Sequence, residues 1–192
     1  MTSAPPHRTA PVLLSADAVG GVWTWAADLA CGLAAEGTPV VLAVLGPAPS
    51  PAQRAAVDRD GIDLRLTGAP LDWTARDPRE VDDAGRILAA LARETGAGLV
   101  HLHAPALAAS APFDVPVAVT VHSCLATWWA AMRGDEPLPS DFRWRIAQTR
   151  EGLARADRVT APTRAFAEAV AAAYGVPPPR VVPNGRARPT RA

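Results

Sequence analysis

Lysine is missing from this sequence, because all 19 basic residues of the 192-residue chain are arginines. Chemistry that needs a lysine ammonium is therefore excluded, namely the phosphate-binding lysine of a Walker-type loop and Schiff-base catalysis. Acidic residues also number 19, so the formal net charge is zero. A balanced charge gives no reason to expect a nucleic-acid partner or a general attraction to anionic membranes.

Cysteines and long apolar runs are scarce as well. Cys31 and Cys124 lack the spacing of a metal site, and we expect two buried free thiols, as in a reducing cytoplasm. The N-terminus has no apolar segment behind a basic start, and no window approaches 18 apolar residues. We therefore predict neither a signal peptide nor a spanning helix. The predicted location is the cytoplasm, with peripheral membrane contact left open.

Two fingerprints of α/β enzymes are absent. The dinucleotide fingerprint needs three spaced glycines and an acidic residue after the second strand. Here only Gly20 and Gly21 follow the first apolar run, and the second run ends in Leu45-Gly46-Pro47. The Gly-x-Ser-x-Gly elbow of α/β hydrolases is also missing. These absences argue against a nicotinamide or flavin oxidoreductase and against a serine hydrolase of this fold class.

Apolar runs alternate with helical patterns along the chain. Runs of strand type lie at 11–15, 39–45, 62–66, 98–103, 115–121, 158–161 and 180–182, and helical patterns lie at 22–36, 52–59, 77–95, 141–156 and 163–174. Continuously apolar strands between helices are typical of a doubly wound parallel sheet covered on both faces. We predict an α/β, Rossmann-like domain at 11–185, between a disordered tail at 1–10 and a loose basic tail at 186–192.

The glycine pair lies where such sheets bind ligands, at the carboxyl ends of strands near the reversal of strand order. Gly20 and Gly21 precede a helix, whose free N–H groups can bind an anion or a sugar hydroxyl. A tight turn that needs glycine only for its dihedral angles is the alternative. The position favours a ligand site.

Three histidines lie at strand ends. His101 and His103 share a face if both belong to the strand, and His122 closes the neighbouring run. We expect His103 and His122 to face the same crevice as the glycine pair, where a neutral imidazole can bind a hydroxyl or accept a proton. We interpret His101 as structural and His122 as functional, and leave both readings open for His103. Zinc bound by these three and Cys124 would need a tighter ligand spacing.

The tryptophans are candidates for contact with a ligand. Trp23 and Trp25 are two residues apart in a helical pattern and point in different directions, so both cannot belong to the core. Ordinary packing is favoured for Trp25. Trp128 and Trp129 predict either an exposed aromatic lip for a lipid or glycan acceptor or a satellite apolar cluster.

Five segments, in order along the chain, resemble segments of the family 4 glycosyltransferases, which have the GT-B fold. They are residues 17–30 with the glycine pair, 100–105, 119–123 with its histidine, 156–163, and 181–185 with a Pro-Asn-Gly turn. The resemblance implies the N-terminal, acceptor-side domain of an enzyme that moves a sugar from a nucleotide-diphosphate sugar to an acceptor hydroxyl. It further implies retention of configuration and no metal or other cofactor.

The resemblance also implies roles for individual residues. Gly20 and Gly21 would lie at an interdomain cleft against the donor diphosphate or the acceptor, His122 beside the reacting sugar, and His103 in the acceptor pocket. Trp23, Trp128 and Trp129 are candidate acceptor contacts. The implied partners are a sugar, glycan or lipid acceptor and a separate C-terminal donor-binding domain.

The chain departs from the pattern of this family in three respects. Residues 186–192 follow the Pro-Asn-Gly turn where the family continues with Val-Asp, the Glu-x7-Glu motif of the nucleotide-binding domain is absent, and a Trp-rich insert follows His122. We therefore expect the chain to be inactive alone. The alternative is a non-catalytic module, derived from such an enzyme, that binds a glycan or a partner.

Overall fold

Seven parallel strands form one sheet in the computed structural model, which describes residues 9–185. Their spatial order is β3 (Ile62–Leu66), β2 (Val40–Leu45), β1 (Val12–Asp17), β4 (Leu99–Leu102), β5 (Val117–Thr120), β6 (Arg158–Ala161) and β7 (Arg180–Val181). The strand order reverses between β1 and β4, which is the switch point of a doubly wound fold. The predicted fold class is confirmed. The predicted tails fall, apart from residues 9 and 10, outside the described residues.

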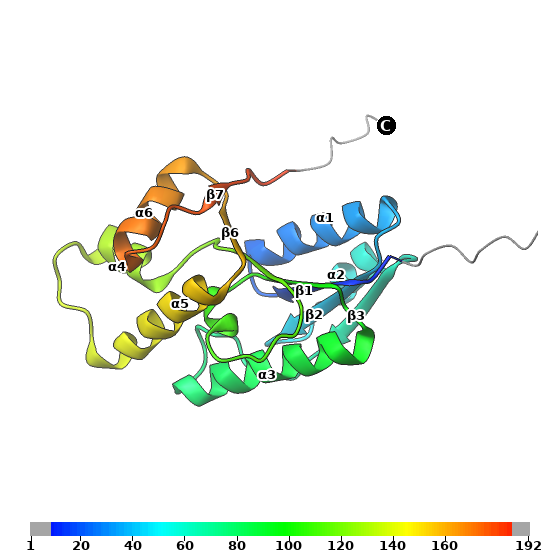
Figure 1. Cartoon of the computed structure of the whole chain (residues 1–192), viewed down its shortest axis with the longest axis horizontal. Helices are drawn as coiled ribbons and strands as arrows, with labels where there is room; N and C mark the ends of the chain where they lie inside the picture. The colour runs from blue at the N-terminus through cyan, green and yellow to red at the C-terminus, as the bar shows by residue number, and fades with distance from the viewer. Residues whose placement is uncertain (1–8, 186–192) are drawn as a thin grey trace, which may run out of the picture.

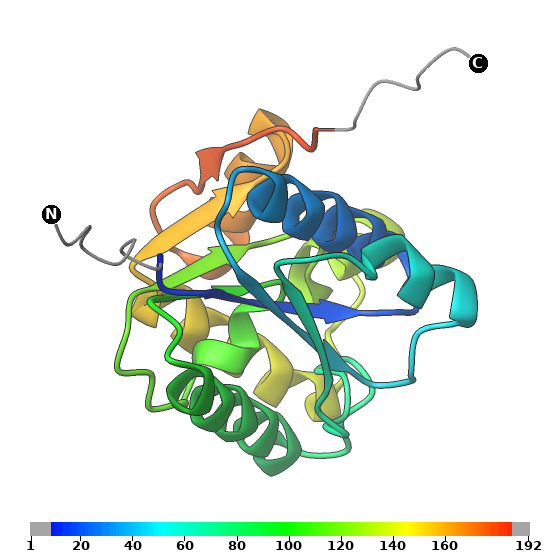
Figure 2. The ribbon, with the colours of Figure 1, turned by 90° about the vertical axis from the view of Figure 1, so that its right-hand side faces the viewer.

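Helices cover the two faces of the sheet unequally (Figures 1 and 2). On one face lie α1 (Gly21–Ala35) and α2 (Pro51–Val57); on the other lie α3 (Pro78–Thr95), the 3-10 helix η1 (Pro105–Ala108), α5 (Arg143–Arg155) and α6 (Arg164–Tyr174). Right-handed crossovers explain the division, because the chain moves across the sheet in opposite directions on the two sides of the switch point. The remaining helices, α4 (Leu125–Arg133) and the 3-10 helix η2 (Ser140–Phe142), join β5 to α5.

Local sequence signals set most helix ends. Ser50 and Gln53 form a capping box at α2, and the Asp77 side chain caps α3, which ends at the left-handed Gly96. Helix α1 has no such cap in the described structure, because the residue at its start is Gly20. Its first N–H groups therefore face the loop after β1.

The apolar core has two parts, one on each face of the sheet. Alternate residues of β1 and β2 enter different parts, so that Leu13 packs toward α3 and Leu14 toward α1. The prediction of strands covered on both faces is correct for β1 and β2. It holds only in part for β4, β5 and β6, where His101, Ala118 and Thr160 on the α1 side are half-buried while Thr120 is buried. In this part of the sheet α1 reaches β4 through Trp25, whose ring lies 5.2 Å from that of His101.

Two glycines hold η1 against its neighbouring helices. A Cβ at Gly152 of α5 would lie 1.8 Å from the Pro105 carbonyl oxygen, and one at Gly85 of α3 would lie 2.6 Å from that of Leu107. Only glycine allows such close approach of two backbones. Both helices therefore fix the segment that directly follows His103.

The two cysteines and the membrane prediction can be placed on this fold. Cys31 and Cys124 are free thiols, half-buried rather than fully buried as expected. Within residues 9–185, none of the helices combines the length and the apolar character that crossing a membrane requires.

Candidate functional site

A pocket of about 240 Å³ lies where β1, β4 and β5 end, and we call it the carboxyl-edge pocket. Asp17, His103 and His122 reach it from the ends of these strands. Its other walls come from the loop after β3 and from α4 and α5. The pocket lies beside the switch point, where doubly wound sheets bind their ligands.

His103 is fixed deep in this pocket by Ser15 of β1. The imidazole Nδ1 lies 2.8 Å from Ser15 Oγ, and the same hydroxyl accepts a hydrogen bond of 3.0 Å from the His103 backbone N–H. Burial lowers the pKa of His103, while the carboxyl groups of Asp72 and Asp17 act in the opposite direction. Because β4 ends at Leu102, His103 does not continue the alternation of the strand and does not share a face with His101.

His122 also lines the pocket and has a free ring nitrogen. Its Nε2 atom is buried without a hydrogen-bond partner among the described residues. The ring packs edge-on against Trp25, with centroids 4.4 Å apart. Burial, followed by the neighbouring histidines, lowers the pKa of His122 to about 4. The imidazole is therefore neutral near pH 7 and can donate to or accept from a ligand hydroxyl, depending on its tautomer.

His101 lies apart from the pocket, on the α1 side of the sheet. Its Nε2 atom is 2.8 Å from Thr120 Oγ1, which is itself 2.8 Å from Thr160 Oγ1. This hydrogen-bond chain across β4, β5 and β6 satisfies the imidazole, whose pKa burial lowers to about 4. The geometry supports a structural role for His101.

The glycine loop is tied down by Asp17, a residue that the sequence interpretation overlooked. Asp17 Oδ1 accepts hydrogen bonds from the backbone N–H groups of Val19 (2.9 Å) and Gly20 (3.2 Å). Such turns are a recognised use of aspartate before glycine, and the Asp-Ala-Val-Gly pattern could have revealed it. Gly20 and Gly21 have no positive φ, and a Cβ at either would meet nothing within 4 Å. The described structure therefore gives no internal reason for glycine at these two positions, and a turn that needs its dihedral freedom is not the explanation.

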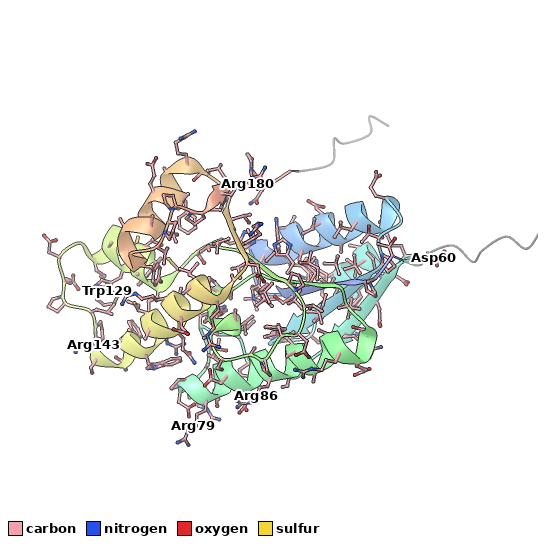
Figure 3. The ribbon with its side chains drawn as sticks, in the orientation of Figure 1. Asp60, Arg79, Arg86, Trp129, Arg143 and Arg180 are labelled. Carbon is pink, nitrogen blue, oxygen red and sulfur yellow. The ribbon has the colours of Figure 1, made fainter. Side chains whose placement is uncertain are left out.

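The candidate tryptophans lie in different environments. Trp128 is 49% exposed and lines the pocket. Trp129 lies outside the pocket lining, where its Nε1 donates to the Glu136 carbonyl (2.9 Å) and its ring packs on Phe142. Figure 3 shows it beside Arg143, at the end of the molecule opposite Asp60.

The two tryptophans of α1 lie in environments other than those that the sequence favoured. Trp23 is 6% exposed in the core between α1 and the sheet, and it does not line the pocket. Trp25, expected to be the ordinary packing residue, is half-buried and contacts the rings of both His101 and His122. A ligand in the pocket would therefore meet Trp128 rather than Trp23 or Trp129.

Several residues of the pocket were not identified from the sequence. Burial raises the pKa of Asp72, and His103 and Arg145 lie close enough to oppose that rise. Arg145 donates to the backbone carbonyls of Asp72 and Ala75, each at 2.5 Å, and its guanidinium lies 4.3 Å from the centre of the Trp144 ring. The only available clue was the pairing of tryptophan with a charged residue, Asp72-Trp73 and Trp144-Arg145, after apolar or helical segments.

A metal-binding set is not found among residues 9–185, in which no three His, Cys, Asp or Glu side chains are grouped to hold an ion. The zinc arrangement weighed from the sequence therefore has no counterpart in this part of the chain. His101 is turned to the opposite side of the sheet from the pocket that His103 and His122 share.

The model of Glycosyltransferase Family 4 matches residues 19–186. The chain belongs to glycosyltransferase family 4. No curated protein matches its sequence. The matched range contains the glycine loop and every residue of the carboxyl-edge pocket except Asp17.

Solved structures show the same fold for this family 4 chain. A glycosyltransferase from Rickettsia africae ESF-5 aligns with a TM-score of 0.57 at 14% identity, over 92% of this chain and 42% of that chain. Phytolacca americana UGT2, complexed with UDP-2fluoro-glucose and pterostilbene, aligns with a TM-score of 0.53 at 14% identity, over 93% and 54%. The chain spans about half the length of these proteins and has the Rossmann-like fold of an N-terminal GT-B domain.

Proposed function

We propose that this chain is the acceptor-side domain of a retaining glycosyltransferase that moves a sugar from a nucleotide-diphosphate sugar to an acceptor hydroxyl. The observation that carries this proposal is His122, which lines the carboxyl-edge pocket and whose buried Nε2 atom has no hydrogen-bond partner among the described residues. A buried polar nitrogen without a partner is destabilising unless a ligand supplies one. A hydroxyl of the acceptor or of the reacting sugar would supply it.

His122 would act as a neutral group that orients the reacting hydroxyl. With a pKa of about 4 it carries no charge near pH 7. Its ring orientation is supported by Trp25, which packs edge-on against it. Correct placement of a reacting hydroxyl accelerates transfer because it removes orientational freedom before the reaction.

Gly20 and Gly21 would bind the diphosphate of the donor. They begin α1, whose N-terminus carries a partial positive charge and is uncapped by any side chain in the described structure. Without side chains, the two residues let phosphate oxygens approach the N–H groups that begin α1, of which that of Gly20 already donates to Asp17 Oδ1. This arrangement would stabilise the negative charge that develops on the leaving diphosphate.

A separate donor-binding domain would complete the site. The glycine loop and the pocket lie at one edge of the sheet, where a second domain can cover both. Phytolacca americana UGT2, which is complexed with UDP-2fluoro-glucose, extends well beyond this chain, since the alignment covers only 54% of it. We therefore propose that residues 1–192 alone do not transfer sugar and that the assembled enzyme does so without a metal.

The test is His122→Ala, measured in an assembly of this chain with a family 4 donor-binding domain. We expect turnover, followed as release of the nucleoside diphosphate, to fall by about 10²–10⁴, the usual contribution of a positioned proton-transfer or hydrogen-bonding group. The matched control is His101→Gln, which removes a histidine outside the pocket and should keep turnover within about twofold. Near-wild-type turnover in His122→Ala would contradict the proposal, as would sugar transfer by the isolated chain for the proposed need of a second domain.

The alternative function is a non-catalytic module that binds a glycan or a partner. It is favoured if the chain binds a sugar in its pocket and no assembly with a donor-binding domain transfers sugar.

A further inference from the structure

We infer that the carboxyl-edge pocket takes a single uncharged, hydroxyl-rich ring, a sugar or cyclitol without phosphate or carboxylate groups. This inference rests on the proposed function and narrows its acceptor class. It combines the size of the pocket, its charge balance, its unpaired polar atoms and its aromatic rim.

The size of the pocket suits one ring. Its volume is about 240 Å³, below the ~300–1,000 Å³ of sites that enclose drug-sized ligands. The pocket is open at its mouth, where two tryptophans are exposed, so a longer glycan or an aglycone could extend outward. The enclosed part of the acceptor is therefore one ring.

The charge balance is unfavourable for an anion. The charged side chains that line the pocket are Asp17, Asp72 and Arg145. Arg145 is engaged with the backbone carbonyls of Asp72 and Ala75 and lies over the Trp144 ring. With two carboxyl groups against one engaged guanidinium, a phosphate or carboxylate placed here would lack a cation, and burying an unpaired charge is strongly unfavourable.

Unpaired polar atoms favour a ligand with several hydroxyl groups. Besides His122 Nε2, the carbonyl oxygen Oε1 of Gln148 is buried without a partner among the described residues. The amide nitrogen of the same Gln148 is already used, since it donates to Pro78 and Asp82. His122 follows β5 and Gln148 belongs to α5, so these groups lie on different walls of the pocket. A polyol ring presents hydroxyls around its whole edge and can serve groups on both walls, whereas a phenol has one or two hydroxyls on one side of a flat ring.

The rim of the pocket supplies flat apolar surfaces. Trp73 is 59% exposed and Trp128 is 49% exposed, and both line the pocket. The large apolar faces of indoles pack well against the C–H faces of sugar rings, while the N–H remains available to hydroxyls. Trp129 of the same helix lies outside the pocket lining, where it contacts Phe142, Glu136 and, edge-on, the ring of Trp128.

The experiment is saturation-transfer NMR on the 192-residue chain with matched probes. The neutral probes are methyl α-glucopyranoside, methyl α-mannopyranoside and myo-inositol; the anionic ones are glucose 6-phosphate and myo-inositol 1-phosphate; resorcinol represents the phenols. We expect saturation transfer from the protein to at least one neutral ring. The affinity of the protein for that ring should be at least tenfold higher than its affinity for the phosphorylated counterpart or for resorcinol. Trp128→Ala should weaken binding at least fivefold, and Trp128→Phe should restore part of it. The control Trp129→Phe, which keeps an aromatic ring beside Trp128, should leave binding unchanged.

The inference is overturned if the phosphorylated rings or resorcinol bind as well as the neutral rings, if no neutral ring binds, or if Trp129→Phe weakens binding as much as Trp128→Ala. These outcomes do not depend on catalysis. Neutral-ring binding without transfer in any assembled enzyme would contradict the proposed function alone. Transfer to a phosphorylated acceptor would contradict the inference alone.

Discussion

Strands β1 and β2 differ from strands β4, β5 and β6 in how they are covered. All of β2 and nearly all of β1 are buried, so both faces of these strands belong to the core. In β4, β5 and β6 the residues on the α3 side are mostly buried, while on the α1 side His101, Ala118 and Thr160 are half-buried and Thr120 is buried. One sheet thus contains a part that is core on both faces and a part that is core on one.

The difference shows how crossover direction places polar side chains. Helices that follow β1 and β2 lie on the α1 side, and those that follow β4, β5 and β6 lie on the α3 side (Figure 1). Within the described structure, the α1 side of β4, β5 and β6 is therefore covered only in part, by Trp25 of α1, and can hold hydroxyls and an imidazole. The hydrogen-bond chain of His101, Thr120 and Thr160 lies in that region.

The largest effect should come from a cavity in the strand that is covered on both faces. Leu42 of β2 is fully buried, and Leu42→Ala should lower the free energy of unfolding by about 2–5 kcal/mol, as lost transfer energy and a residual cavity predict. Urea unfolding followed by circular dichroism measures the change. The matched control is Leu66→Ala in β3, where the side chain is 49% exposed and the loss should be about 0.5 kcal/mol. Equal losses for the two variants would refute the contrast in burial.

The second effect is a pH dependence that belongs to the strands covered on one face. Burial lowers the pKa of His101 to about 4, so the folded chain keeps this imidazole neutral while the unfolded chain protonates it near 6.5. The contribution of the neutral His101 imidazole to the stability of the fold is complete above about pH 6.5 and is lost as the pH falls toward 4. We expect the advantage of wild type over His101→Gln in unfolding free energy to shrink by about 2 kcal/mol between pH 7 and 4. A difference independent of pH would show that His101 titrates alike in both states.

The smallest effect concerns the two threonines of the hydrogen-bond chain. Thr120 bonds the side chains of both His101 and Thr160, whereas Thr160 bonds Thr120 and donates a long hydrogen bond of 3.4 Å to the Val119 carbonyl. Thr120→Val should destabilise by about 1–2 kcal/mol because it leaves the imidazole unpaired, and Thr160→Val by about 0.5 kcal/mol. Thermal unfolding of both variants ranks them. A larger loss for Thr160→Val would mean that this order of connections is incorrect.

The sequence was sufficient for the fold class and for the edge of the sheet that forms the site. Alternating apolar runs and helical patterns predicted the doubly wound sheet, and strand-end positions brought His103 and His122 to one pocket. The prediction succeeded because these features depend on local periodicity and on general rules of strand connection. The roles proposed for His122, the glycine pair and Trp128 stay predictions until tested.

The remaining features depend on tertiary contacts that no local pattern encodes. Helix α4 was not predicted, since none of its residues is buried and it lacks a clear apolar stripe. Asp72 and Arg145 meet although 73 residues separate them. The exchange of roles between Trp23 and Trp25 depends on the rotation of α1 against the sheet, which spacing alone does not fix. How far the α1 side of β4 is covered depends on which helices lie over it, and the residues of the strand do not encode that.

The contacts of Gly85 and Gly152 with η1 have a consequence for how this site can vary. They join backbone to backbone, so the distance from the strand ends to α3 and α5 does not depend on which side chains fill the space between them. The depth of the pocket is therefore set by the main chain, whereas its rim is made of side chains such as Trp73 and Trp128. Exchanges at the rim would change which ring enters, and the ring would still rest at the same level above the sheet.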